Sequence, residues 1–506
     1  MRTAGILMPI TSLPSPYGVG TLGQCARDFI QFLHRAGQTY WQILPICPTG
    51  YGDSPYQSFS SYAGNPYMID FDDLKKEGLL QEEEYASISW GDNPARVDYS
   101  LLYSHKFSIL RIACSRISGV LSERFQTFCK EQNVWLNDYA LYMSIKDYHG
   151  GQSWKEWPET LQKREKDSLE AIHQELTDEI LFWKKVQFLF FYQWDRLKAY
   201  AEENNIKIIG DLPIYVSYDS ADVWAHPEEF QLDENLCPIE VAGCPPDGFS
   251  ADGQLWGNPI YDWAAMKKDG YSWWISRLSH ALKTYDTVRI DHFRAFASYW
   301  EIPADSKTAK VGKWVDGPKM DLFNKIFDAL GSNAPIIAED LGVFGDDVVK
   351  LLEDTKFPGM KVIQFGFDPN SDSSHLPHNA APNSINYVVT HDNNTILGWL
   401  WEADESERAF ALDYCHFKGD NWGEGGYCSA SCRSIIEAVW QSASNIAIIA
   451  LQDMCGFGSD ARMNIPGVPE KNWRFRTTRD TIDSIDSEYF KKINALYRRM
   501  YPAFDK

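Results

Sequence analysis

The chain has 506 residues and carries 48 basic against 70 acidic side chains, a formal net charge of -22 at pH 7. Such an acidic protein is a poor partner for the phosphate backbone of nucleic acids. No apolar run approaches the length of a membrane span, and the N-terminal residues MRTAGILMPI are not followed by a signal-peptide cleavage site. We therefore expect a cytoplasmic protein that binds neither nucleic acid nor membrane.

The ten cysteines are scattered through the chain without a C-x-x-C pair. The nearest two, Cys428 and Cys432, lack the further Cys or His ligands that a zinc site requires. We expect reduced thiols, and neither a metal nor an organic cofactor is implied. The sequence leaves the oligomeric state unknown.

Strand and helix patterns alternate from the N-terminus. Residues 5–10 and 39–46 read as strands, and 25–36 between them has helical spacing. This alternation with short connections indicates a parallel sheet. Residues 70–166 break the rhythm, because they contain few strand-like runs and several charged, amphipathic stretches. We expect a helical insertion there, between the second and third strands.

The alternation resumes after a long helix at 180–203. Six further strands are predicted at 206–209, 287–293, 335–339, 361–365, 387–390 and 446–451. Eight such strands predict an α/β fold, a single (β/α)8 TIM barrel over residues 1–506 with large, mainly helical insertions. The alternative, an open doubly wound sheet, usually has fewer strands and a glycine-rich phosphate loop after the first.

A long irregular segment is expected at 233–263, with turn residues that include Pro245 and Pro246. A loop of that length inside a compact protein is usually a lid or a binding loop. Phe249, Leu255 and Trp256 would give it an apolar cover. We expect this segment to cover the active site.

Acidic residues follow the predicted strands, where catalytic groups of such a barrel lie. They are Asp211, Asp291, Glu339, Asp340, Asp392 and Asp453. One such residue is commonplace as a helix cap, but several at one barrel mouth, together with basic neighbours, predict a site. Packed together they would repel one another unless one is protonated, which is the division of labour in a glycosidase. His292 fits an orienting role or contact with substrate equally well.

Three carboxylates can be given roles. Arg289 and Asp291 project from the same face of a strand, so the guanidinium should keep Asp291 ionised as a nucleophile. Taken alone, the pair also fits a structural ion pair at a strand end. Glu339 follows an apolar run, so burial and a nearby anion should raise its pKa and suit it to proton donation. Asp392, beside His391, would bind sugar hydroxyls and stabilise the transition state.

These strings resemble the catalytic regions of the α-amylase clan: VRIDHFR at 288–294, AEDLG at 338–342 and THDN at 390–393. More narrowly, the chain resembles the 4-alpha-glucanotransferases, also called amylomaltases or disproportionating enzymes (glycoside hydrolase family 77), over nearly its whole length. Further blocks similar to that family stand at 53–57, 210–215, 245–247, 257–259, 462–467 and 472–474. The block at 462–474 is the most specific of them.

The resemblance implies an enzyme that transfers a segment of an α-1,4-glucan to the 4-hydroxyl of another glucan or of glucose, with retention of configuration. Its partners would be α-1,4-glucans and maltooligosaccharides, with glucose as an acceptor. Asp291 would be the nucleophile, Glu339 the acid/base and Asp392 the transition-state stabiliser. Substrate contacts are implied for Tyr56, Asp211, Gln254, Trp256, Arg289, His391 and Asn464.

Two departures from the family pattern are Ala295, where glycine is usual, and Asn394, where an acid is common. Either could shift loop positions or substrate preference. Two other functions compete with transfer. One is hydrolysis of α-1,4-glucans by an enzyme of the same clan. The other is non-catalytic glucan binding, against which the intact set of three carboxylates argues.

Overall fold

Eight parallel strands close a barrel at the centre of the molecule, seen in a computed structural model that describes residues 2–246, 251–342, 345–468 and 471–500. Around the barrel the strands follow the order β1-β12-β11-β10-β9-β6-β3-β2. Their bounds are β1 Thr3–Leu7, β2 Tyr40–Gln42, β3 Lys207–Leu212, β6 Thr287–Ile290, β9 Ile336–Ala338, β10 Gly359–Val362, β11 Ser384–Tyr387 and β12 Ile446–Ala450. Each predicted strand has its counterpart, so the (β/α)8 barrel is confirmed. Two of the predicted ranges lie too far along the chain, because β10 ends at Val362 within the predicted 361–365 and β11 ends at Tyr387, the first residue of the predicted 387–390.

Alternate residues along the barrel strands belong to two different hydrophobic clusters. Leu7, Ile209 and Ile448 belong to the cluster inside the barrel, whereas their strand neighbours, such as Ile208 and Ile449, pack among the residues under the helices. Successive side chains of a strand point to opposite faces, so a strand buried on both sides is apolar throughout. This is why the barrel strands read as short continuous apolar runs.

The third strand is longer than we expected. We predicted 206–209 and placed Asp211 after it, but β3 runs to Leu212, and Asp211 pairs in register with Arg289 on β6. Gly210 permits this course because a Cβ there would meet the ring of Tyr285 at 2.2 Å. Sequence patterns end the strand before this Gly-Asp pair, since both residues are uncommon within strands.

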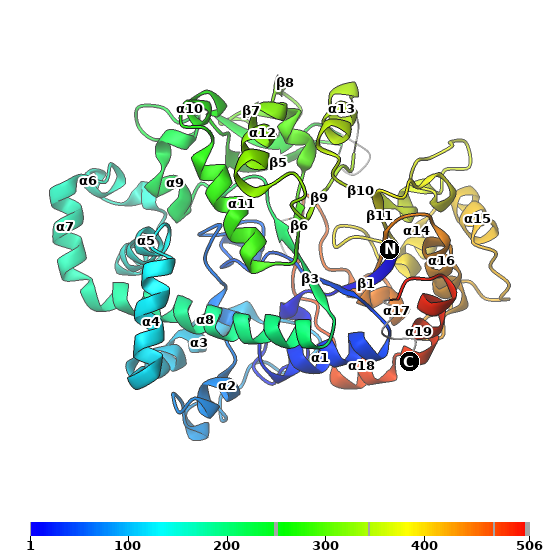
Figure 1. Ribbon diagram of the computed structural model, residues 1–506, viewed down its shortest axis with the longest axis horizontal. Coiled ribbons are helices and arrows are strands. Elements are labelled where there is room, and N and C mark those ends of the chain that lie inside the picture. The colour runs from blue at the N-terminus through cyan, green and yellow to red at the C-terminus, as the bar shows by residue number, and fades with distance from the viewer. Residues whose placement is uncertain (1, 247–250, 343–344, 469–470, 501–506) are drawn as a thin grey trace.

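Helices surround the barrel; in the view of Figure 1, α4–α7 lie at the left and α14–α17 at the right. The connection between β2 and β3 contains α2 Phe71–Lys76, α3 Tyr99–Ser115, α4 Gly119–Glu131, α5 Leu136–Tyr148, α6 Glu159–Gln162, α7 Lys166–Glu175 and α8 Thr177–Glu203. The remaining α-helices of the described residues are α1 Gln24–Arg35, α9 Ala221–Ala225, α10 Trp263–Lys268, α11 Ser272–Thr284, α12 Lys319–Leu330, α13 Asp346–Thr355, α14 Ile396–Glu402, α15 Glu405–Tyr414, α16 Ala430–Gln441, α17 Leu451–Met454, α18 Arg479–Ser484 and α19 Ser487–Leu496. The segment 70–166 is thus helical, and the helical run continues to Glu203.

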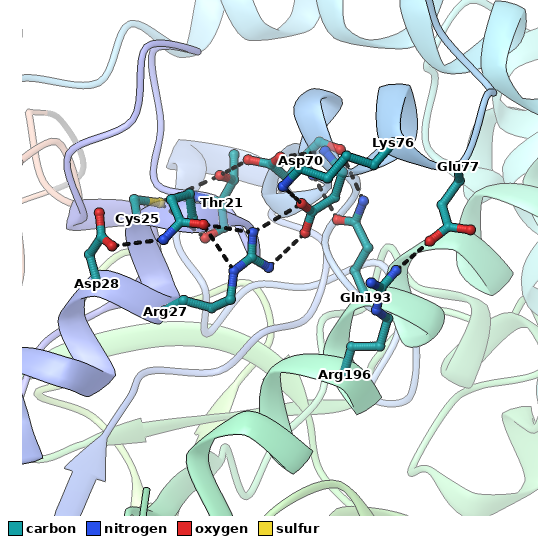
Figure 2. Close-up of polar contacts among 11 residues, drawn as sticks. Thr21, Cys25, Arg27, Asp28, Asp70, Lys76, Glu77, Gln193 and Arg196 are labelled. Atoms are coloured by element: carbon teal, nitrogen blue, oxygen red, sulfur yellow. Dashed lines mark hydrogen bonds and ion pairs between the residues drawn. The ribbon is translucent and has the colours of Figure 1, made fainter. Parts of the chain in front are cut away.

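Two buried glutamines attach helix α8 to the loop after β2. The Gln193 amide accepts from the backbone N–H of Asp70 at 2.7 Å and donates to the Asp70 carbonyl at 2.9 Å. Gln187 makes the same two bonds with Gly64, at 2.7 and 2.9 Å. In Figure 2 Gln193 and Thr21 approach Asp70 from different elements, and Thr21 donates to the Asp70 carboxylate at 2.6 Å. The helix thus supplies acceptors for the backbone N–H groups of Gly64 and Asp70, which are buried away from water.

The segment 233–263 is not irregular throughout, contrary to our expectation. It contains β4 Glu240–Cys244 and β5 Gln254–Pro259, which join β7 Ser298–Pro303 and β8 Lys313–Asp316 in an antiparallel sheet of order β5-β4-β7-β8. Local patterns missed it because β4 pairs with β7, far along the chain, and such pairing decides whether a short strand forms. Asp247 and Phe249 lie outside the described residues.

The ten cysteines all fall in the described part of the chain, and each is a free thiol. Among the helices of that part, none combines the length and the apolar character needed to cross a membrane.

Replacing Gln193 by alanine should destabilise the fold. The change leaves the buried N–H of Asp70 without its partner, while the Asp70 carbonyl keeps the N–H of Leu74, so we expect the free energy of unfolding to fall by about 1–3 kcal/mol. Urea denaturation followed by tryptophan fluorescence measures this. Gln174→Ala, at an exposed position of α7, is the control and should change stability by less than about 0.5 kcal/mol. Equal effects of the two substitutions would contradict the role given to Gln193.

Candidate active site

A fully buried ion pair forms the floor of the barrel mouth. The Arg289 guanidinium contacts both carboxylate oxygens of Asp211, at 2.7 and 2.6 Å, and the two side chains are 3% and 0% exposed. Burial opposes the charge of Arg289, but the carboxylates of Asp211 and Asp291 raise its pKa well above the ordinary value. The Tyr56 hydroxyl donates to Asp211 at 2.6 Å. Arg289 is therefore a fixed, permanent cation.

Asp291 follows β6 directly and lies within reach of the same guanidinium. Its Oδ1 is 3.1 Å from Arg289 Nη2, and 26% of its side chain is exposed. Burial raises the pKa of Asp291 to about 6, against the opposing effect of Arg289 and with a further increase from the anionic Asp211. We expected Arg289 to dominate the pKa of Asp291, but the shortest contacts of Arg289 are with Asp211. Asp291 is still ionised at neutral pH.

Glu339 follows β9, the strand next to β6 in the barrel. Its carboxylate accepts from the backbone N–H of His292 and of Leu341, each at 2.7 Å. Burial raises the pKa of Glu339 to about 8; Arg289 opposes this increase and the charge of Asp291 adds to it. The expected elevation of this pKa is found, so Glu339 is protonated at neutral pH and can act as an acid.

His292 takes a left-handed backbone conformation, with φ 50° and ψ 45°. A residue other than glycine pays a conformational cost there, and such residues concentrate at functional sites. This conformation lets the His292 N–H bind Glu339 while the preceding residue is Asp291. Burial, with a smaller effect from Arg294, lowers the pKa of His292 to about 3, so its ring is neutral.

Asp392 lies in the loop after β11, held by two partners. The Asn464 amide donates to its Oδ1 at 2.6 Å, and His391 Nε2 lies 3.3 Å from its Oδ2. Burial would raise the pKa of Asp392, but the neighbouring His391 and the Asn464 hydrogen bond together lower it below the ordinary value. Burial would likewise lower the pKa of His391, and Asp392 raises it instead. Asp392 is therefore a stable anion.

Aromatic rings line both walls around these acids. The ring of Tyr56 stacks on His391 at a centroid distance of 5.2 Å and contacts Trp473 at 5.6 Å. On the other wall, Trp256 meets His292 edge to face at 4.9 Å and donates from Nε1 to Gln254 at 3.2 Å. Planar rings held in this way suit the apolar faces of a sugar.

These groups converge on one open cleft of about 850 Å³. Of the predicted site residues, those that line it are Tyr56, Gln254, Trp256, Arg289, Asp291, Glu339, His391, Asp392 and Asn464. Asp211 does not line it, because its carboxylate is enclosed behind Arg289 and Tyr56. Asp340 and Asp453 also stay outside the lining and accept from the backbone N–H of Met360 and Ile396. Among the described residues, no group of three His, Cys, Asp or Glu side chains could hold a metal ion.

Sequence reasoning did not single out Trp473 or Arg462. Trp473 lines the cleft with φ 62°, and Arg462 donates to the backbone carbonyl of Asp392 at 2.7 Å. Both lie in the blocks at 462–474, which was the available signal.

The structure also shows where the two departures from the family pattern lie. Ala295 is buried in the short helix after Asp291, and the amide of Asn394 donates to Glu402 and to Ser459.

Comparisons with known proteins agree with this geometry. The family model of the 4-alpha-glucanotransferases matches residues 8–481. The chain belongs to this family. It is 46% identical to the 4-alpha-glucanotransferase of Thermus thermophilus over 488 residues, covering 94% of each chain. It is 45% identical to that of Streptococcus pneumoniae over 502 residues, covering 99% of this chain and 98% of the relative.

A solved amylomaltase from Streptococcus agalactiae in complex with acarbose has the same fold, with a TM-score of 0.95 at 39% identity, covering 99% of this chain and 100% of that one. Family membership over the whole chain makes this protein a glucanotransferase, a transferase that acts on glucans. The predicted activity is thereby confirmed, and the hydrolase and binding-protein alternatives have less support.

The glucanotransferase activity should have a bell-shaped pH profile. The two coupled carboxyls give apparent pKa values of about 6 and 8, which belong to the pair. With the predicted roles, the rate should fall below pH 6 because a protonated Asp291 cannot act as the nucleophile. It should fall above pH 8 because a deprotonated Glu339 cannot act as the acid. Initial rates of maltotriose disproportionation at low substrate, measured from pH 4 to 10, would test this, and a rate that still increases above pH 9 would contradict it.

Substituting Asp211 by asparagine should move the acidic limb of that profile downward. Removing this anion eliminates one cause of the raised pKa of Asp291 and frees Arg289 to pair with it. The kcat/KM profile of Asp211→Asn should therefore retain activity to lower pH, at a reduced maximum. Asp420→Asn, at an exposed position, is the control and should leave the limb in place. An upward shift in Asp211→Asn would refute the charge coupling.

Proposed function

We propose that Asp291, Glu339 and Asp392 carry out glucan transfer by a retaining double displacement. The observation that supports this most directly is the placing of an ionised and a protonated carboxyl on adjacent strands, joined through the His292 N–H. In the first step an Asp291 oxygen attacks the anomeric carbon of the donor glucan. Glu339 gives its proton to the glycosidic oxygen, and the reducing-end fragment leaves.

In the second step the 4-hydroxyl of an acceptor glucan attacks the glycosyl ester. Glu339, now a carboxylate, takes the hydroxyl proton, and the Asp291–carbon bond breaks. Two inversions restore the α configuration. Asp392 remains anionic throughout and would stabilise the positive charge that develops on the sugar. Arg289 holds Asp291 in place and His391, with Tyr56 against it, would contact the sugar at the cleavage point.

Asp211 would act on the substrate through Tyr56 and Arg289. Because its carboxylate is enclosed, we assign it a positioning role in place of the sugar contact implied by the resemblance. Gln254, Trp256 and Asn464 would bind glucan units along the cleft. The segment 233–263 would cover the bound chain and keep water away from the ester.

The substrates are glucans, and we propose that they are α-1,4-linked maltooligosaccharides with glucose as the smallest acceptor. The related amylomaltase solved with acarbose supports an oligosaccharide as ligand. The net charge of -22 supports our proposal that nucleic acids are not partners. The mechanism requires no metal or organic cofactor. We also propose a cytoplasmic location, which the scattered cysteines without disulfide or zinc spacing support.

The roles of the two central carboxyls can be separated by substitution. Glu339→Gln removes the proton donor but spares the nucleophile, so a maltosyl fluoride, whose leaving group needs no acid, should trap the ester. Mass spectrometry should find a glycosyl adduct on the peptide that contains Asp291. Asp291→Asn, the matched control, should form no adduct and lose turnover by several orders of magnitude. An adduct on another peptide would overturn the assignment.

The aromatic walls should favour transfer over hydrolysis. Water is far more concentrated than any sugar, so an acceptor must succeed through positioning, which can contribute roughly 7–11 kcal/mol. Tyr56→Ala and Trp256→Ala should each raise the share of hydrolysis, measured as free reducing ends against total transfer. Tyr427→Ala, an exposed aromatic position outside the cleft lining, is the control. If neither cleft variant raises the share, the rings serve packing alone.

A further inference from the structure

The small antiparallel sheet brings to the cleft an indole that the mechanism above does not use. Trp314 on β8 lines the same cleft as Asp291 and Glu339, and 45% of its surface is exposed. A Trp side chain is among the largest apolar groups and contributes most to stability when buried. One that stays half-exposed inside a substrate cleft is suited to contact with a ligand.

The ring of Trp314 is held by its neighbours. The guanidinium carbon of Arg294 lies 4.0 Å from its ring centroid. Trp300, the residue opposite in the β7–β8 register, contacts it at 5.3 Å with the rings inclined by 62°. A ring fixed in this way loses little side-chain entropy when a ligand binds, which favours affinity.

The strand that carries Trp314 is fixed as well. Trp300 donates from Nε1 to the carbonyl of Ala309 at 2.9 Å. Gly312 lies directly against the Trp300 indole, because a Cβ there would meet it at 2.6 Å. Lys313 pairs with Glu301 across the strands at 3.2 Å. These contacts fix β8, the edge strand of the sheet, and with it the position of Trp314.

The position of this wall relative to the two carboxyls indicates which part of the substrate it meets. Trp314 contacts Arg294, which follows Asp291 by three residues and whose charge interacts with that of Glu339. Trp256, on the opposite edge strand of the same sheet, contacts His292, whose N–H binds Glu339. The opposite wall, with Tyr56 and Trp473, belongs instead to His391. Because Glu339 exchanges its proton with the leaving and the attacking oxygen, its wall faces the leaving fragment and then the acceptor.

We propose that Trp314, supported by Arg294, is a stacking platform for a glucose unit of an acceptor chain, beyond the unit that receives the donor segment. The ligand is an α-1,4-glucan, and the platform makes long acceptors better substrates than glucose. The inference rests on the proposed function, since the role of Glu339 defines the acceptor side. Trp314 is then a specificity-determining residue of the transfer reaction.

Acceptor competition tests the platform. With an isotopically labelled maltosyl fluoride as donor, the labelled products give kcat/KM for maltopentaose and for glucose as acceptors. In Trp314→Ala the ratio of the two values should fall about fivefold to tenfold, the worth of one aromatic contact. Trp314→Phe keeps a ring and should retain most of the ratio. Val311→Ala, 70% exposed near the same strand and outside the cleft lining, should leave the ratio unchanged.

An unchanged ratio in Trp314→Ala, or a fall of equal size in Val311→Ala, would overturn the proposal. Binding gives a second measurement that does not depend on turnover. Calorimetry on Asp291→Asn and on the double variant with Trp314→Ala should show that the affinity for maltoheptaose relative to maltose falls about fivefold to tenfold. Equal relative affinities would again overturn it. A wild type that transfers nothing even to glucose would instead refute the proposed function, and the binding comparison would still decide on the platform.

Discussion

The buried pair of Arg289 and Asp211 is the constraint on which the site depends. A charge enclosed in the barrel is costly unless it is paired and hydrogen-bonded, and here β3 and β6 bring the partners together in register. Arg289 therefore makes its shortest contacts with Asp211, and the Tyr56 hydroxyl donates a further hydrogen bond to the same carboxylate. Arg289 therefore stabilises the anionic form of Asp291 less than it would without Asp211. Burial, opposed by Arg289 and reinforced by the charge of Asp211, raises the pKa of Asp291 to about 6, which leaves this carboxyl ionised at neutral pH.

The same arrangement gives the two central carboxyls, Asp291 and Glu339, different pKa values. Glu339 is more enclosed than Asp291 and has no cation of its own, so its proton is held up to a pKa of about 8. The left-handed backbone at His292 turns an N–H toward Glu339 just after the nucleophile. Conformational strain at one residue thus fixes the relative position of both carboxyls, a use of strain that is common at functional sites.

The sequence predicted the features that depend on local patterns. Apolar runs bounded by turns located all eight barrel strands, and acids after those runs located Asp291, Glu339 and Asp392 at one cleft. Features that depend on distant pairing were not predictable. The small sheet needs the partnership of β4 and β7, and the commitment of Arg289 to Asp211 needs the β3–β6 register. The composition rich in tryptophan could not show which rings, such as Trp473, reach the cleft.

The barrel closes between the two ends of the chain. β1 pairs with β12, with Thr3 opposite Ile446, so the first strand of the protein finds its second neighbour only when nearly nine-tenths of the chain is present. During synthesis β1 therefore presents an unpaired parallel edge while everything up to β11 is made. Such edges invite association with other chains, and non-local parallel pairing is slow. The barrel cannot close before β12 is made, so a chain that lacks β12 leaves one edge of β1 unpaired.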